Sequence, residues 1–316
     1  MVRWLVRAVV SLVVVGVLLA IIPFDAVLDA LRRVSLWTWL SSVAIFFGGH
    51  YLNAMKLRLL LGAPPAGQES ALTAACVRAQ YAGLVANLGL PGLAGGDLAR
   101  AAYLAPTVGV ARVAFASVAD RMIDTATVLL LVAIALPLAG MPEAIAGIVR
   151  SAGAWVAGAA VAGLVCAAAG AVVLMRVQRF AGVAEKMGKA TKALLSRKGA
   201  FAGAVVISFS VQSAFVMTNV WLARQVGVTT GLAAWYVAWP LSKLVAVLPI
   251  SLGGIGVREA ALVSLLAPYG APREAVLASG ILWQAVLIVT GLVGLVITQM
   301  LPWTAPVAVA PSAEHS

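Results

Sequence analysis

The chain has 316 residues, of which 63% are hydrophobic and only 10% are charged, and its mean hydropathy is +1.04. A soluble domain is about half apolar and about a quarter charged, so this composition argues against one large soluble core and indicates a polytopic membrane protein. The formal net charge is +11, and the two cysteines lie in different apolar segments, which excludes a disulfide framework or a cysteine metal site.

Six apolar segments are each long enough to cross a bilayer, which takes about 20 helical residues. In chain order they are residues 5–22, 37–61, 114–138, 154–175, 200–223 and 275–301. The second segment carries polar residues in its second half, and the third carries three charges near its start. Because five further spans follow, we expect the first segment to be a transmembrane helix rather than a cleaved signal peptide. Residues 303–316 are expected to form a disordered polar tail.

Two further segments, residues 71–107 and 230–268, are apolar but interrupted by Pro and Gly near their middles. Each is long enough for two half-helices or for two short crossings, and the sequence leaves both arrangements open. Either arrangement returns the chain to the side it left. The sequence therefore predicts an all-α membrane fold of six transmembrane helices and two broken helical hairpins.

Both broken segments carry the same motif, which is Pro, three residues, Gly-Gly, three residues and Arg, in copies 158 residues apart. Helix-breaking residues at matching places in two halves of a membrane protein point to a transport site. Proline removes a backbone donor and glycine permits unusual dihedral angles, so we expect hairpin tips whose free N–H groups favour an anion. The residues expected to shape these tips are Pro91, Gly95, Gly96, Pro249, Gly253, Gly254 and Gly256.

The distribution of basic residues predicts the topology. Residues 176–198 hold seven basic residues against the single Glu185, so this loop is expected on the cytoplasmic side. Counting spans from this loop assigns both termini to the cytoplasm and makes the two broken segments enter from opposite sides. We therefore expect one inner-membrane domain over residues 1–316, an inverted-topology repeat with halves 1–145 and 150–302.

Ionisable side chains inside apolar segments are costly, so they are the first candidates for function. Asp97 lies three residues before Arg100, on the same helical face, and is suited to hold it. The competing hypothesis is structural: Arg–Asp pairs clamp a hairpin, or arginines reach the headgroups. His50, in the second span, is expected to form a helix–helix hydrogen bond. The candidate substrate-binding residues are Asn87, Asp97, Arg100, Asp120, Arg121, Asp124, Lys243, Ser251, Arg258 and Glu259.

Two stretches of the chain carry a family resemblance. The first runs Asn87-Leu-Gly-Leu-Pro91, then Gly95-Gly96-Asp97 and Arg100, followed by Asp120-Arg121. The second is Lys243 followed by Leu248-Pro249-Ile-Ser-Leu-Gly253-Gly254-Ile-Gly256-Val-Arg258-Glu259. They resemble the two signatures of the lysylphosphatidylglycerol synthase transmembrane-region family, and the resemblance covers roughly residues 5–300.

That family includes the flippase domain of the multiple peptide resistance factor, which moves aminoacylated phosphatidylglycerol between leaflets. It also includes hopanoid-associated and archaeal glycosylation-associated proteins. In the resistance factor, aminoacyl transfer belongs to a separate soluble domain. The present chain ends about 15 residues after its last span, so we expect no such domain and no synthase activity. Many relatives carry an Arg near the start of the last span, where this chain has Leu282-Trp283-Gln284.

The leading hypothesis is an inner-membrane flippase that moves an anionic or headgroup-modified lipid between leaflets by alternating access. The alternatives are a non-catalytic scaffold or regulator of envelope lipid metabolism, and a transferase that uses a lipid-linked donor. The sequence has no DxD or HExxH motif and only two histidines, so we expect no enzymatic activity, cofactor or metal. Membrane lipids are the expected partners and nucleic acid is not; lipid-synthesis enzymes and a homodimer are left open.

Overall fold

The computed structural model describes residues 32, 34–64, 67–89, 94–140, 194, 196–246 and 256–300. The chain divides into two compact units, of which the first comprises residues 1–139 and 203–316 and the second residues 140–202. Two predicted spans, 5–22 and 154–175, and the tail 303–316 lie outside the described residues. The regular structure within the described residues is entirely helical, as the composition predicts.

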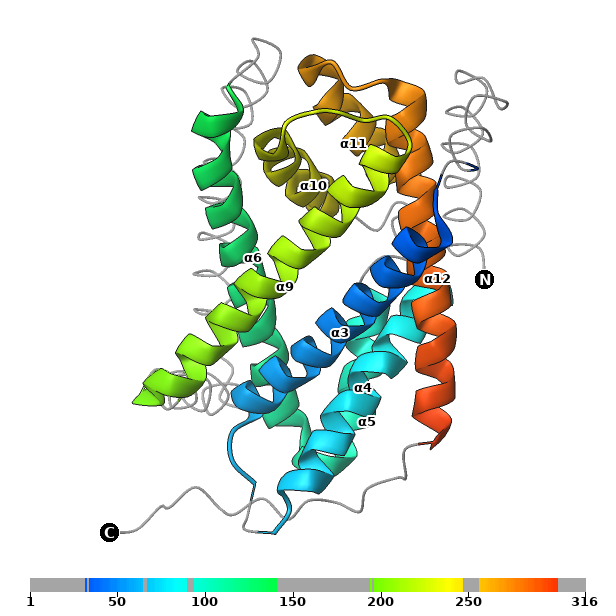
Figure 1. The fold of residues 1–316 in the computed structure, drawn as a ribbon. Helices are drawn as coiled ribbons and strands as arrows, with labels where there is room; N and C mark the ends of the chain where they lie inside the picture. The colour runs from blue at the N-terminus through cyan, green and yellow to red at the C-terminus, as the bar shows by residue number, and fades with distance from the viewer. Residues whose placement is uncertain are drawn as a thin grey trace, which may run out of the picture. The chain divides into compact units, whose positions relative to one another are not determined.

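Four helices make up the described part of the first half of the chain. They are α3 (Leu36–Leu61), α4 (Glu69–Gly89), α5 (Ala94–Val108) and α6 (Val110–Ala139), shown in Figure 1. The hydroxyl of Ser35 accepts a hydrogen bond from the backbone N–H of Thr38 and begins α3. Only Gly109 separates α5 from α6, and its φ of 87° is one that a residue with a side chain rarely adopts.

The second half of the chain repeats this order of long helix, two shorter helices and long helix. Its elements are α9 (Lys198–Gln225), α10 (Leu232–Ala246), α11 (Val257–Leu266), the 3-10 turn Ala267–Tyr269 and α12 (Arg273–Met300). Each broken segment of the sequence thus contains two helices that contact each other, α4 with α5 and α10 with α11, and we call each pair a hairpin. In Figure 1 the two hairpins lie toward opposite ends of the first unit.

Three of the described helices, α6, α9 and α12, are long and apolar enough to cross a membrane. They correspond to three of the six predicted spans. A fourth predicted span, residues 37–61, is helical as α3, but α3 is not one of these three helices, and its second half carries His50, Lys56 and other polar residues. The hairpin helices α10 and α11 have 15 and 10 residues. At about 1.5 Å per residue they extend roughly 22 and 15 Å, less than the roughly 30 Å of a hydrocarbon core.

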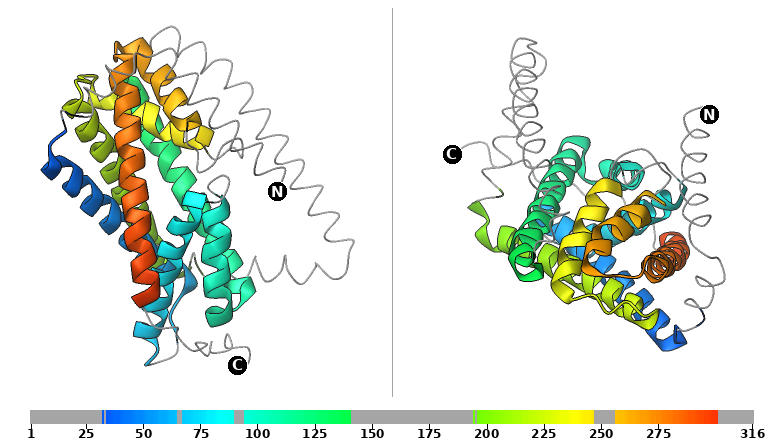
Figure 2. Two further views of the ribbon diagram at one scale, coloured as in Figure 1. Left: turned by 90° about the vertical axis from the view of Figure 1, so that its right-hand side faces the viewer. Right: turned by 90° about the horizontal axis from the view of Figure 1, so that it is seen from above.

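Each hairpin packs against helices of both halves. Within a half, α4 contacts α5 and α5 contacts α6, and likewise α10 contacts α11 and α11 contacts α12. Between halves, α4 packs on α12 and α10 packs on α6. Both views in Figure 2 show α11 beside α12. The interior between the hairpins is therefore lined by helices from both halves of the chain.

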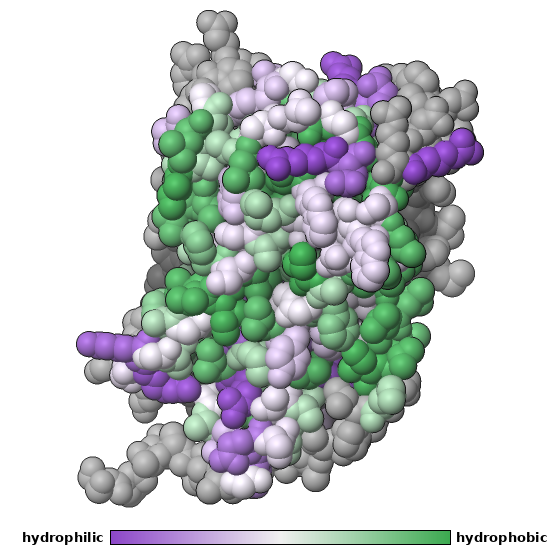
Figure 3. All heavy atoms as spheres, in the orientation of Figure 1, coloured by the Kyte–Doolittle hydropathy of each residue, from purple (hydrophilic) through white to green (hydrophobic). Residues whose placement is uncertain are grey.

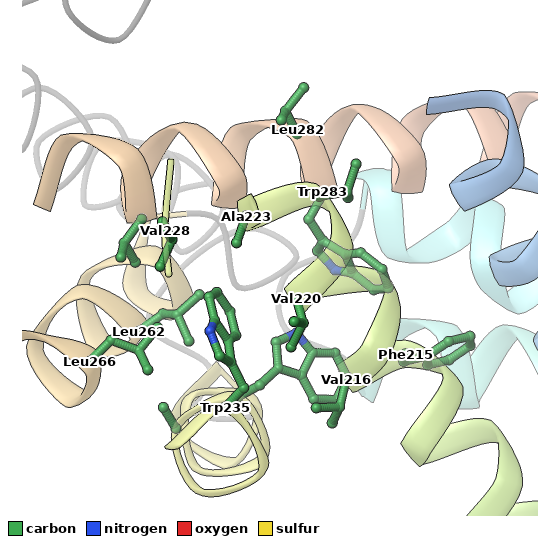
Figure 4. Packing of buried hydrophobic residues seen from close by; sticks show 14 of the residues in the cluster. Phe215, Val216, Val220, Ala223, Val228, Trp235, Leu262, Leu266, Leu282 and Trp283 are labelled. Atoms are coloured by element: carbon green, nitrogen blue, oxygen red, sulfur yellow. The ribbon is translucent and has the colours of Figure 1, made fainter. Parts of the chain in front are cut away.

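The buried apolar cluster is richest around α9, α10 and α12. Trp235 of α10 is completely buried, and Figure 4 shows it close to Leu262 and Leu266 of α11. Trp283 of α12 lies over Phe215 of α9, with ring centroids 5.9 Å apart. These aromatic residues each remove a large apolar area from solvent and fix the hairpin α10–α11 against its neighbours.

The outer faces of the long helices are apolar. Exposed large residues include Leu129, Leu130 and Ile134 on α6, and Leu292 and Val296 on α12. Figure 3 shows the molecule from the same side as Figure 1. On the face that it shows, the most hydrophilic residues lie toward the upper and lower ends, with apolar and weakly polar residues between them. A surface of this kind suits contact with lipid chains.

The hairpin α4–α5 closes by an unusually tight backbone contact. A Cβ atom on Gly83 would lie 2.7 Å from the carbonyl oxygen of Gly96, a backbone atom that has no side-chain freedom to move away. Beside this contact, Oδ1 of Asn87 accepts a hydrogen bond of 2.8 Å from the N–H of Gly96. The two glycines and Asn87 thereby set the position of Arg100, one turn further along α5.

We predict that Gly83→Ala destabilises the protein by about 1–3 kcal/mol, because the added methyl group forces α4 and α5 apart. Gly48→Ala is the matched control, since a Cβ at Gly48 meets nothing within 4 Å. This control should be neutral or stabilising by up to about 1 kcal/mol through helix propensity. Thermal unfolding of the purified variants in detergent measures both changes, and equal midpoints would contradict the close contact.

Candidate functional site

A cavity of about 180 Å³ lies in the interior of the first unit, and every α-helix that the structure describes contributes to its wall. Its charged residues are Asp97, Arg100, Asp120, Arg121, Asp124, Lys243 and Arg258. Its amide side chains are Asn53, Gln80, Asn87, Gln212 and Gln284. Its remaining polar and aromatic lining residues are His50, Phe46, Phe215, Trp239 and Trp283.

Behind this wall, a buried lysine joins two carboxylates of α6. Nζ of Lys56 lies 3.0 Å from Oδ1 of Asp120 and 2.5 Å from Oδ1 of Asp124, and its side chain is completely buried. Oγ of Ser208, on α9, donates a hydrogen bond of 2.6 Å to the same oxygen of Asp124. Burying a charge without a partner is very costly, so this cluster ties α3, α6 and α9 together.

Asp120 and Asp97 also hold the arginine of the first motif. Nη1 of Arg100 lies 2.9 Å from Oδ2 of Asp120, and Nη2 lies 3.3 Å from Oδ1 of Asp97. Asp97 therefore holds Arg100, as the spacing predicts. Oδ1 of Asp97 accepts a second, very short contact from Arg121 of α6. The three cations Lys56, Arg100 and Arg121 are balanced by three aspartates within one continuous network.

Three of the cavity cations also contact the oxygen of a glutamine from a different helix. Nη1 of Arg100 donates to Oε1 of Gln80 at 3.3 Å, and Nζ of Lys243 donates to Oε1 of Gln212 at 3.0 Å. Nη2 of Arg258 donates to Oε1 of Gln284 at 3.3 Å. A neutral amide orients a cation without cancelling its charge. Arg100 and Arg258 also pair with carboxylates, so of these three cations it is Lys243 whose charge is left for a ligand.

Lys243 differs from the other cations of the site. It makes no salt bridge with any described residue; its polar partner is Gln212, and its Nζ lies 5.6 Å from the centre of the Trp239 ring. The aromatic face attracts the ammonium but does not neutralise it. Among the described cations of this cavity, Lys243 is therefore the one without a carboxylate at salt-bridge distance.

The arginine of the second motif is paired within its own helix. Arg258 contacts Oε1 of the neighbouring Glu259 through both Nε, at 3.1 Å, and Nη2. Oε2 of Glu259 accepts a hydrogen bond of 2.7 Å from the N–H of Gly256, which begins α11 with φ of 83°. A Cβ on Gly280 of α12 would lie 2.7 Å from Cγ of Glu259. The absence of a side chain at Gly280 thus makes room for the carboxylate that orients Arg258.

His50 is linked to the first motif through Gln80. Because Oε1 of Gln80 accepts from Arg100, its amide nitrogen is the atom that donates to Nδ1 of His50, at 3.1 Å. A neutral imidazole with Nδ1 as acceptor carries its proton on Nε2. Nε2 is buried and makes no hydrogen bond with any described residue. This bond between α3 and α4 is the helix–helix hydrogen bond expected of His50.

Aromatic rings form one continuous side of the cavity, from Lys243 to His50. Trp239 and Trp283 meet edge to face with centroids 5.8 Å apart, and Trp283 meets Phe46 in the same way at 4.9 Å. Phe46 in turn lies 4.5 Å from the His50 ring. The cavity therefore has charged residues from α5, α6, α10 and α11 and a continuous row of rings from α3, α10 and α12.

Eight of the ten predicted substrate-binding residues line this one cavity, although they come from two segments far apart in the sequence. Glu259 does not line it but pairs with Arg258, and Ser251 lies outside the described residues. Of the residues predicted to shape the hairpin tips, Gly96 makes the close contact and Gly256 the positive φ, whereas Gly95 lies in the first turn of α5. The others, Pro91, Pro249, Gly253 and Gly254, lie outside the described residues.

Several residues of the site are not among the candidates that the sequence indicates. Lys56 is an ionisable residue inside a predicted span, and the rule that selected the other charges would have found it. Gln80, Gln212 and Gln284 carry no such signal, because an isolated glutamine in an apolar helix has no distinctive spacing. Their role depends on which helices meet, which only the tertiary structure determines.

A family model described as "lysylphosphatidylglycerol synthase TM region" matches residues 4–294 of the chain. The match covers both motifs and all the cavity residues. No curated protein and no solved structure shows a significant match to the chain.

We predict that Lys56→Met destabilises the protein by about 3 kcal/mol or more, because Asp120 and Asp124 would then face each other without the cation between them. Lys198→Met, at the exposed start of α9, is the control and should have little effect. Adding Asp124→Asn to Lys56→Met should recover part of the loss, since the two residues are coupled. Thermal unfolding in detergent tests this, and additive effects of the two substitutions would contradict the pairing.

Proposed function

This chain belongs to the lysylphosphatidylglycerol synthase transmembrane-region family, and we propose that it is a flippase that moves an anionic lipid between the leaflets of the inner membrane. Family membership and the apolar helices make it a membrane protein with a lipid-related function. The flippase activity, the inner-membrane location and the cytoplasmic termini are our proposal. The proposal includes no catalytic role for the chain.

The observation that carries this proposal is the set of cations around an enclosed cavity in an apolar helix bundle. Arg100, Lys243 and Arg258 come from three helices, and each is oriented by a neutral glutamine. Charges are retained inside membrane proteins where they bind ions or substrates or form a polar pathway. The chemical group that such a site suits is the phosphate of a lipid headgroup.

A charged pair at the exposed edge of the cavity supports movement of a lipid rather than a soluble ion. Among the cavity residues, the side chains of Arg121 and Asp97 are 45% and 30% exposed, so their pair lies where the cavity meets the outside. The residues that follow them, Met122 and Leu98, are 68% and 71% exposed and apolar. A headgroup would enter between α5 and α6 while its acyl chains stay against these apolar side chains.

The two hairpins support alternating access. They follow the same order in each half of the chain, lie toward opposite ends of the unit in Figure 1, and each pack on the last helix of the other half. We propose that the two halves form an inverted repeat, an arrangement that opens a central site first to one side and then to the other as the halves exchange conformations. We propose that the charged cavity is that central site.

Arg100→Ala and Arg258→Ala should each reduce lipid movement by roughly tenfold or more, because each removes a cation from the headgroup site. Movement is measured with a fluorescent anionic phospholipid in proteoliposomes, by quenching of the outer leaflet. Arg224→Ala, at the exposed end of α9, is the matched control and should move lipid at the rate of the unmodified protein. Normal rates for both cavity variants would favour the scaffold hypothesis instead.

Gln212→Glu tests the sign of the cargo. The substitution keeps the shape of the side chain and adds a carboxylate beside Lys243, so it should cancel that charge and lower movement of an anionic lipid roughly tenfold. Gln212→Leu removes the hydrogen bond but leaves the charge, and should cost less. If Gln212→Glu preserved or increased movement, the cargo would carry a positive headgroup, contrary to the proposal.

A further inference from the structure

We infer that the cavity selects a lipid with a single net negative charge, a phosphodiester whose headgroup is otherwise uncharged and carries hydroxyl groups. The inference rests on the proposed function, because it names the class of lipid that this cavity would take. It depends on the charge balance of the described site and on the chemistry of the aromatic side of the cavity.

The charge balance covers the ionisable residues that line the cavity, together with those that form ion pairs with them. The cations are Lys56, Arg100, Arg121, Lys243 and Arg258, and the carboxylates are Asp97, Asp120, Asp124 and Glu259. Five cations against four carboxylates leave one positive charge. The two breaks at residues 90–93 and 247–255 contain no ionisable residue, so their sequences do not change this balance.

Lys243 carries the uncompensated charge. The other four cations each pair with a carboxylate at hydrogen-bonding distance, whereas Lys243 pairs with the amide of Gln212. One monoanion would therefore neutralise the site. A dianion, such as a phosphomonoester or a pyrophosphate, would bring a second charge that must compete with an aspartate for its cation. A zwitterion would bring its ammonium into a site that is already positive.

The part of the headgroup beyond the phosphate would lie along the aromatic side. Trp239 contacts the ammonium of Lys243, and the series of rings continues through Trp283 and Phe46 to His50. Aromatic faces with a few polar groups suit the C–H surface and the oxygens of an uncharged headgroup. The ring faces attract a cation, but no described carboxylate lies among them to neutralise one, and the Trp239 face is already occupied by the ammonium of Lys243.

Two polar groups at the far end of the rings are suited to hydroxyl groups. Nε2 of His50 is a donor without a described partner. Asn53, one turn further along α3, lines the cavity and makes no hydrogen bond with any described residue. The amide of Asn53 can both donate and accept, as a hydroxyl group requires. Together they distinguish a hydroxylated headgroup from a bare phosphodiester.

The test ranks defined lipids on the purified full-length chain, by native mass spectrometry for retention and in proteoliposomes for movement. The probes are phosphatidylglycerol, phosphatidic acid, phosphatidylethanolamine, lysyl-phosphatidylglycerol and phosphatidylmethanol. Phosphatidylglycerol should be retained roughly tenfold better than the dianionic, zwitterionic or lysylated lipids. It should be retained several-fold better than phosphatidylmethanol, which has the same charge but no headgroup hydroxyl.

Two variants should change the lipid charge that the site prefers in opposite directions, because one removes a positive charge from the site and the other leaves an additional one. Lys243→Gln removes the unpaired charge and should reduce retention of phosphatidylglycerol roughly tenfold, with little change for phosphatidylethanolamine. Asp124→Asn leaves a second uncompensated charge and should raise retention of phosphatidic acid relative to phosphatidylglycerol.

The variant Asn53→Leu tests the recognition of the headgroup hydroxyl. It breaks no described hydrogen bond and should remove only the preference for phosphatidylglycerol over phosphatidylmethanol.

The outcomes separate this inference from the proposed function. Selective retention of phosphatidylglycerol without movement would support the inference and overturn the flippase. Movement or preferred retention of a dianionic, zwitterionic or lysylated lipid would overturn the inference and leave the flippase standing. No selective retention and no movement would overturn both. If a variant fails to fold, the ranking on the unmodified protein still decides the charge class.

Discussion

The whole arrangement depends on the need to compensate charge inside an apolar helix bundle. Lys56 is completely buried, and its contacts to Asp120 and Asp124 join α3 to α6, while Ser208 adds α9. Such a cluster is worth little as a source of stability compared with apolar packing, yet it is costly to break. It therefore specifies which helix faces meet more than it strengthens the fold. The position of Arg100 follows from it, because Asp120 contacts both cations.

The site uses two kinds of partner for its cations, with different consequences. Carboxylates neutralise Lys56, Arg100, Arg121 and Arg258, and so fix the helices that carry them. Glutamines from α4, α9 and α12 orient cations without removing charge. At Lys243, where a glutamine is the only polar partner within hydrogen-bonding distance among the described residues, the charge remains for a ligand. The difference between an amide and a carboxylate thus separates the structural part of the network from the part suited to binding.

Close backbone contacts position the arginine of each hairpin at the cavity. Gly83 and Gly96 allow α4 and α5 to approach so closely that Asn87 caps the N–H of Gly96. At the second hairpin, the space beside Gly280 admits the Glu259 side chain, which caps Gly256 and holds Arg258. The contacts differ between the halves, but in both an arginine on the second helix of the hairpin reaches the same cavity. Both copies of the motif therefore place an arginine at the cavity, but they do so through different contacts.

The sequence by itself determined the all-helical membrane character, the hairpin positions and eight of the residues that line the cavity. Length, hydropathy and the cost of an intramembrane charge are local properties, and they can be recognised in one segment at a time. Only the tertiary structure decided that Glu259 pairs with its neighbour Arg258, that three glutamines orient the cations, and that no described carboxylate lies at salt-bridge distance from Lys243. Those features depend on how helices from both halves meet, because a charge is compensated by whatever side chain the packing brings within about 3–4 Å.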